Sequence, residues 1–131
     1  IDDYAHHPEE IKAMHEAIRT FYPTSRVLAV FQPHLFSRTR DFCAGFATSL
    51  SMFDEALLLD IYPARELPIE GVDSQSIVEK MDIPALVVAK KELPERVSAV
   101  AADVVVMMGA GDIAEEVKAV VSCLKDGHYV G

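Results

Sequence analysis

Four short, almost wholly apolar segments recur along this chain, and stretches with helical spacing lie between them. They occupy residues 26–31, 56–61, 85–88 and 104–108. A strand without a polar face has to be buried on both sides, which is typical of a parallel sheet covered by helices. The alternation therefore predicts an α/β fold with three layers and a mostly parallel sheet.

The intervening segments predict the helices and one more strand. Helices are expected at residues 9–18, 37–53, 74–81 and 92–100 and from 112 to about 124, and an edge strand is expected within 126–131. Pro8 fits the first turn of the first helix, where its missing N–H needs no partner. Asp73 is expected to cap the helix that begins at Ser74.

Length and charge restrict the class of protein. The 131 residues suit a single domain, and the net charge of −9 argues against a nucleic-acid surface, which needs clustered Lys and Arg. No apolar run approaches the ~20 residues that span a bilayer, so no membrane partner is expected. Cys43 and Cys123 lie far apart without metal-type spacing, which predicts a reducing cytoplasm.

The expected ligand edge lies where the parallel strands end. Right-handed crossovers bring the carboxyl ends of such strands to one edge, and ligands bind there. The loops at 32–34, 62–66 and 109–111 should therefore lie at this edge. Asp60 also falls here, and its carboxylate could cap a loop or face the cleft. Gly109 and Gly111 resemble half of a dinucleotide fingerprint, but a tight turn explains them better.

An arginine in the first turn of the second expected helix indicates an anion. Ser37 is the expected N-cap, and Arg38 follows it at the helix end that prefers acids. A bound phosphate or carboxylate held by Arg38 and the helix amides would explain this placement. An ordinary surface arginine is the alternative. Residues 17–40 hold four arginines and no acid, of which Arg19 and Arg26 are expected to be surface charges.

The first eight residues concentrate polar chemistry. Asp2, Asp3, Tyr4, His6 and His7 precede Pro8 on a loop that enters a helix. Adjacent histidines on an extended loop diverge, and the spacing matches no structural zinc pattern, so no protein-only metal site is expected. One histidine is expected to hydrogen-bond a nucleotide or substrate, and the other to pack at the helix entry.

Together these segments resemble the C-terminal domain of the Mur ligases, and among them the members that add L-alanine. The resemblance rests on residues 1–8, 31–34 with 37–40, 59–66 and 109–113, in the family's order. It implies a Rossmann-like domain that closes as a lid over a longer enzyme. Residues 1–131 would be this single domain, cut from a chain that also carries a central and an N-terminal domain.

The resemblance also implies the reaction. A bacterial cytoplasmic enzyme of peptidoglycan synthesis would use ATP and Mg²⁺ to join L-alanine to UDP-N-acetylmuramate through an acyl phosphate. The metal would be held mainly by the central domain and the ATP phosphates. The isolated domain would be inactive.

Residue roles follow from the same resemblance. Asp3, Tyr4 and His6 match positions that border the ATP ribose and phosphates. His34 and Arg38 match positions that line the amino-acid and acyl-phosphate site. Many family members carry arginine where this chain has Leu35, so one cation is lost or supplied by another group, for which Arg40 is a candidate.

Two alternatives remain open on the residues alone. A stand-alone nucleotide- or anion-binding module without catalysis would have no upstream phosphate loop. A His/Asp metallohydrolase would retain stoichiometric zinc or manganese after purification.

Overall fold

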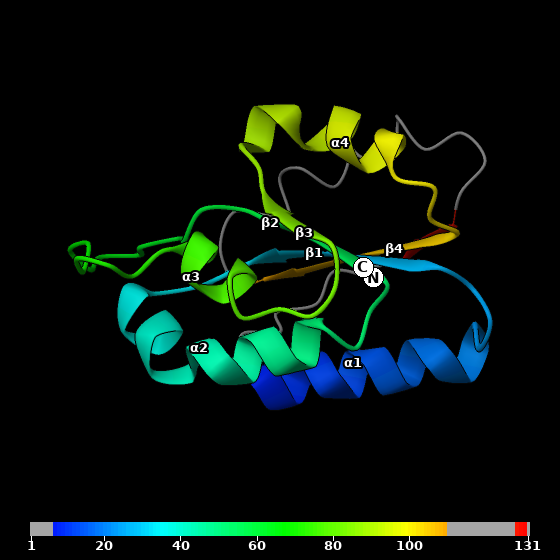
Figure 1. Cartoon of the computed structure of the whole chain (residues 1–131), viewed down its shortest axis with the longest axis horizontal. Coiled ribbons are helices and arrows are strands. Elements are labelled where there is room, and N and C mark those ends of the chain that lie inside the picture. Colours follow the sequence, from blue (N-terminus) through cyan, green and yellow to red (C-terminus); the bar gives the residue numbers. More distant parts are fainter. Residues whose placement is uncertain (1–6, 110–127, 131) are drawn as a thin grey trace.

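The chain forms one parallel sheet with helices on both faces. A computed structural model describes residues 7–109 and 128–130 (Figure 1). Within them the sheet has five strands in the order β3-β2-β1-β4-β5, and every neighbouring pair is parallel. The strands are β1 (Val27–Gln32), β2 (Glu55–Leu58), β3 (Ala85–Val87), β4 (Val104–Gly109) and β5 (His128–Val130). The predicted α/β fold is confirmed, the edge strand included.

The helices divide between the two faces (Figure 1). In this view α1 (Pro8–Phe21) and α2 (Phe36–Leu50) lie below the sheet, and α4 (Leu93–Ala99) lies above it. The short α3 (Ser74–Val78) packs with the first group through Ile77, and a 3₁₀ turn, η1 (Lys90–Glu92), leads into α4. These are the three layers that the apolar strands predicted.

Alternate residues of the central strands form two separate cores. Val27, Ala29 and Phe31 of β1 face α1, α2 and α3. Leu28 and Val30 face α4. Every residue of β1 and β4 is buried, because each strand is covered on both faces and flanked on both sides. This double burial explains why the sequence of both strands lacks polar alternation.

Several predicted boundaries shift. The second helix begins at Phe36, so Ser37 lies inside it and the prediction of Ser37 as N-cap is wrong. Leu35 occupies the cap position with a φ of 72°, a conformation that favours glycine. The predicted strand over 56–61 ends at Leu58. Asp73 does cap α3, through a hydrogen bond from the Ser76 N–H. The helix expected beyond residue 112 lies outside the described residues.

The strand order reverses between β1 and β4. From β1 the chain runs outward through β2 and β3 and returns on the other side as β4, where Gln32 pairs with Gly109. Ligands of such folds bind at this reversal, outside the carboxyl ends of the strands. Gly109 has a φ of 155°, which side chains rarely permit, so a glycine is required there. No helix in the described part of the chain is long and apolar enough to cross a membrane.

Candidate functional site

Two predicted edge loops are joined by main-chain hydrogen bonds beyond the ends of β1 and β2. The Tyr62 N–H donates to the Pro33 carbonyl at 2.8 Å, and the Leu35 N–H donates to the Tyr62 carbonyl at 2.9 Å. His34 and Tyr62 thereby form a parallel bridge outside the regular strands. The pairing of β1 with β2 is thus extended into the loops, which fixes the backbone that carries His34.

His34 and Arg38, which the resemblance assigns to one site, lie in contact. Arg38 Nη1 is 3.1 Å from His34 Nδ1, and the His34 ring stacks on Tyr62 with ring centres 5.7 Å apart and planes inclined by 15°. Arginine offers only donors, so Nδ1 has to accept and the ring proton is assigned to Nε2. The imidazole and the guanidinium therefore both present N–H donors, which suits an anionic oxygen.

The amino end of α2 already holds a carboxylate from this chain. Glu66 accepts hydrogen bonds from the Ser37 N–H at 3.1 Å and from the Ser37 hydroxyl. These two bonds hold the pKa of Glu66 below its ordinary value. An anion does lie at this helix end, as expected, but it is the carboxylate of Glu66 rather than a bound ligand. Of the helix amides that were expected to join Arg38 at a bound anion, that of Ser37 is therefore already bonded within the chain.

Two hollows flank Tyr62. One, of about 550 Å³, is lined by Leu35, Tyr62, Ala64, Arg65 and Glu66. The other, of about 420 Å³, is lined by Gln32, Leu59, Asp60, Ile61, Tyr62, Pro63, Ala89 and Lys90. Arg65 thus lines the same hollow as Leu35. The candidate Arg40 is exposed, and its Nε bonds Asp41 at 2.9 Å.

Three predicted nucleotide contacts cannot be placed. Asp3, Tyr4 and His6 lie outside the described residues, as does Asp2. Among the residues that the structure describes, no three His, Cys, Asp or Glu side chains gather as a metal site. His7 occupies the cap position of α1, and its ring packs edge-to-face on the ring of Phe42 with the ring centres 5.3 Å apart. It takes the packing and helix-entry role expected for one of the two histidines.

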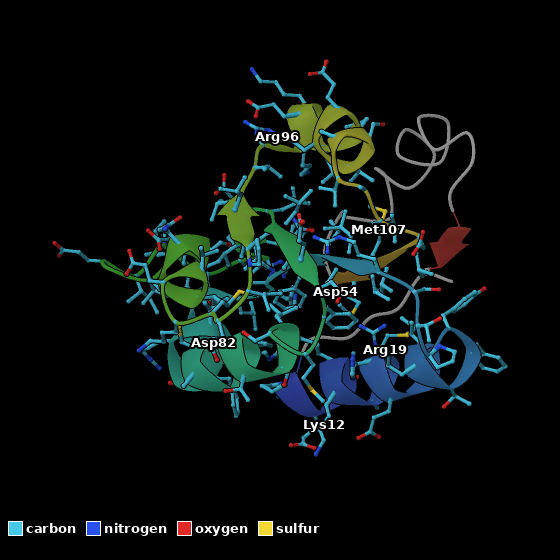
Figure 2. All side chains as sticks on the ribbon, turned by 45° about the vertical axis from the view of Figure 1, so that its right-hand side comes forward. Lys12, Arg19, Asp54, Asp82, Arg96 and Met107 are labelled. Carbon is cyan, nitrogen blue, oxygen red and sulfur yellow. The ribbon has the colours of Figure 1, made fainter. Side chains whose placement is uncertain are left out.

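The acid-free arginine stretch does not form a continuous positive surface. Arg19 on α1 pairs with Asp54 at 3.0 Å and is only partly exposed (Figure 2). Arg26 pairs with Glu55. Arg19 is therefore a structural residue rather than the plain surface charge expected. Arg38 of the same stretch lies against His34.

Sequence reasoning missed the partnership of Ser37 with Glu66 and the placement of Lys90 in the same hollow as Asp60. The sequence did contain a signal for the partnership of Ser37 with Glu66. The first turn of α2 contains an arginine and no acid, so a carboxylate from elsewhere was needed to complement the helix end. Glu66 was predicted only to lie at the ligand edge, as part of the loop at 62–66. Lys90 offered no local signal, because the register of β3 against β2 decides where it lies.

Known proteins resemble this chain in sequence and in fold. A family description, "Mur ligase, glutamate ligase domain", matches residues 1–114. UDP-N-acetylmuramate–L-alanine ligases from Christiangramia forsetii and Flavobacterium johnsoniae are 60% and 58% identical over 95% and 96% of this chain. The chain spans 28% of the length of each.

A solved structure supports the same fold. The UDP-N-acetylmuramate-alanine ligase of Thermotoga maritima superposes with a TM-score of 0.66 and 24% identity, over 93% of this chain and 25% of that one. At this identity the likeness concerns the fold, and it agrees with the parallel sheet and its two helical layers.

Proposed function

Because this chain belongs to the Mur ligase family, we propose that residues 1–131 form the C-terminal domain of a ligase that joins L-alanine to UDP-N-acetylmuramate. The identities of 60% and 58% to ligases of that name support the choice of substrates. The enzyme works in the bacterial cytoplasm, in peptidoglycan synthesis. The central and N-terminal domains of the same protein supply what this domain lacks.

The chemistry requires an activated carboxylate. An amide does not form from a carboxylate until one oxygen becomes a good leaving group, and ATP with Mg²⁺ supplies the phosphoryl group that achieves this. The amine of L-alanine then attacks the carbonyl carbon of the acyl phosphate, and negative charge grows on the acyl oxygen. The tetrahedral intermediate collapses to the amide by expelling phosphate, and the nitrogen loses a proton. Positioned N–H donors stabilise such charge strongly in a site that excludes water.

His34 and Arg38 are the groups of this domain that we assign to that charge. Their contact of 3.1 Å and the stacking on Tyr62 fix both side chains before substrate arrives. Fixed donors need no reorganisation during the reaction. This pre-formed pair at the ligand edge of a Mur ligase fold is the observation that carries the proposal. Asp3, Tyr4 and His6 remain predicted contacts of the ATP ribose and phosphates.

The reaction is tested with the full-length parent protein. Phosphate release is measured with ATP, Mg²⁺ and UDP-N-acetylmuramate, with and without L-alanine. Release that depends on both the sugar nucleotide and L-alanine supports the ligase. No release from a folded protein that still binds ATP contradicts it and favours a nucleotide-binding module.

Arg38→Ala tests the assignment of the pair. We expect turnover to fall at least tenfold, a barrier increase of roughly 1.4 kcal/mol or more. Arg96→Ala is the matched control, because Arg96 is an exposed arginine on α4, on the opposite face of the sheet (Figure 2). An unchanged rate in Arg38→Ala, or an equal loss in Arg96→Ala, removes Arg38 from the site.

A further inference from the structure

The loop after β2 reaches across to the start of α2 and holds it from outside. Glu66 lies 29 positions beyond Ser37 in the sequence, yet its two carboxylate oxygens receive the Ser37 N–H and hydroxyl. The N–H bond and the hydroxyl bond involve different oxygens, Oε1 and Oε2. A two-point contact of this kind fixes an orientation as well as a distance, and a charged acceptor makes it stronger than a neutral one.

The same loop anchors the other end of the turn. The main chain of Tyr62 bonds Pro33 and Leu35, and its ring stacks on His34. Residues 33–38 are therefore held by Tyr62 on one side and by Glu66 on the other. Leu35 lies between these anchors with a φ of 72°, a conformation that persists only where the surroundings impose it. Arg38 follows Ser37 directly, so its direction depends on this first turn.

We propose that Glu66 is a positioning residue of the ligase site: by clamping Ser37 it sets the first turn of α2 so that Arg38 meets His34 and both face the reacting acyl group. This inference rests on the proposed function for its catalytic consequence. Its structural part, that the Glu66 carboxylate holds the turn over residues 35–38, can be tested without any activity.

The kinetic test uses the full-length protein and four single variants, besides Arg38→Ala and its double variant with Glu66→Ala. Glu66→Ala removes the clamp, and Glu66→Gln keeps its shape with one acceptor oxygen. Glu70→Ala is the matched control, an exposed glutamate on the same loop. Ser37→Ala removes only the hydroxyl donor to Glu66, and it replaces Glu66→Ala in the test if Glu66→Ala does not fold.

We expect kcat/KM for L-alanine to fall at least ~5-fold in Glu66→Ala and less in Glu66→Gln, and to stay unchanged in Glu70→Ala. The KM for ATP should not move, because the predicted ATP contacts are on another loop. In an Arg38→Ala background, Glu66→Ala should cost no more than about twofold further, since groups that act as a unit are not additive. Wild-type kinetics in Glu66→Ala, or losses that multiply in the double variant, would overturn the proposal.

Hydrogen exchange of the full-length protein separates this proposal from the proposed function. Peptides that cover residues 35–40 should exchange faster in Glu66→Ala than in the wild type or in Glu70→Ala. Unchanged exchange there would refute the clamp even in an active ligase. Faster exchange in a protein that lacks alanine-dependent phosphate release would sink the ligase assignment while the clamp stands.

Discussion

At the scale of single residues, Arg19 shows how one side chain ties three segments together. Its guanidinium donates to the Ser25 carbonyl at 2.6 Å, to Asp54 at 3.0 Å and to His15 Nε2 at 3.2 Å. Asp54 also accepts the Val27 N–H at 2.7 Å, at the start of β1. The end of α1, the turn before β2 and the first central strand thus share one polar network.

His15 makes this network sensitive to pH. Burial, and then the positive charge of Arg19, lower the pKa of His15 from its ordinary 6.5, although Glu16 and Asp54 act in the opposite sense. The unfolded chain therefore binds a proton more readily than the folded one. The contribution of His15 to stability is complete above about pH 6.5 and is lost as the pH falls through its folded pKa.

We expect urea unfolding to show the wild type losing more stability between pH 7.5 and 5.5 than His15→Gln does. The glutamine oxygen can still accept from Arg19, but the side chain does not titrate. The comparison cancels the contributions of the other histidines. Equal losses in the two proteins would show that His15 is not responsible.

At the scale of elements, the packing of α1 on α2 depends on a glycine. A Cβ atom added at Gly45 would lie 2.9 Å from Pro8 Cγ and 3.3 Å from Pro8 Cβ. The ring cannot swing away easily, because it is in the first turn of α1 and the Ser49 hydroxyl donates to the Pro8 carbonyl at 2.9 Å. The close contact of α1 with α2 therefore requires the missing side chain.

Gly45→Ala is expected to lower the free energy of unfolding by about 1 kcal/mol. Overpacking lowers the free energy of unfolding by roughly 1–3 kcal/mol, whereas exchanging glycine for alanine inside a helix raises it by about 1 kcal/mol. Chemical denaturation measures the difference. Adding Pro8→Ala should recover part of the loss, because the ring that meets the new methyl group is gone. Simple additivity of the two substitutions would argue against the contact as the cause.

At the scale of the whole molecule, the described chain has the organisation of a self-contained domain. Two apolar cores lie on opposite faces of one sheet, and the central strands are fully buried. Of its predicted site residues, the two that the structure describes, His34 and Arg38, lie together at one edge of the sheet, and the 131 residues contain no phosphate-loop motif. Both observations support the proposal that the chain is a closing domain of a larger ligase.

We therefore expect the 131-residue chain expressed alone to unfold in a single cooperative transition and to release no phosphate from ATP with either substrate. The cores supply the cooperativity, while the sugar site and the phosphate loop have to come from the rest of the enzyme. Calorimetry and the phosphate assay, run beside the full-length protein, measure the two properties. Activity of the isolated chain would contradict its role as a closing domain.

The sequence alone determined the architecture of this protein and the sheet edge at which its candidate site lies. Apolar runs without alternation permit only strands buried on both faces, so the parallel sheet and its helical layers followed, as did the meeting of the loops after β1 and β2. The resemblance to the Mur ligases assigned His34 and Arg38 to one site, and their side chains lie 3.1 Å apart in the structure. Asp73 was recognisable as a cap from the local sequence.

Only the tertiary structure decided how that site is held. Glu66 reaches Ser37 because parallel pairing brings together two loops that are 29 residues apart, and no local pattern encodes that distance. α2 begins at Phe36 instead of after a Ser37 cap, and Ser37 gives its N–H and hydroxyl to Glu66. Helix ends and loop conformations depend on contacts with residues that are distant in the sequence. The burial of a strand, by contrast, can be predicted from the apolar composition of the strand itself.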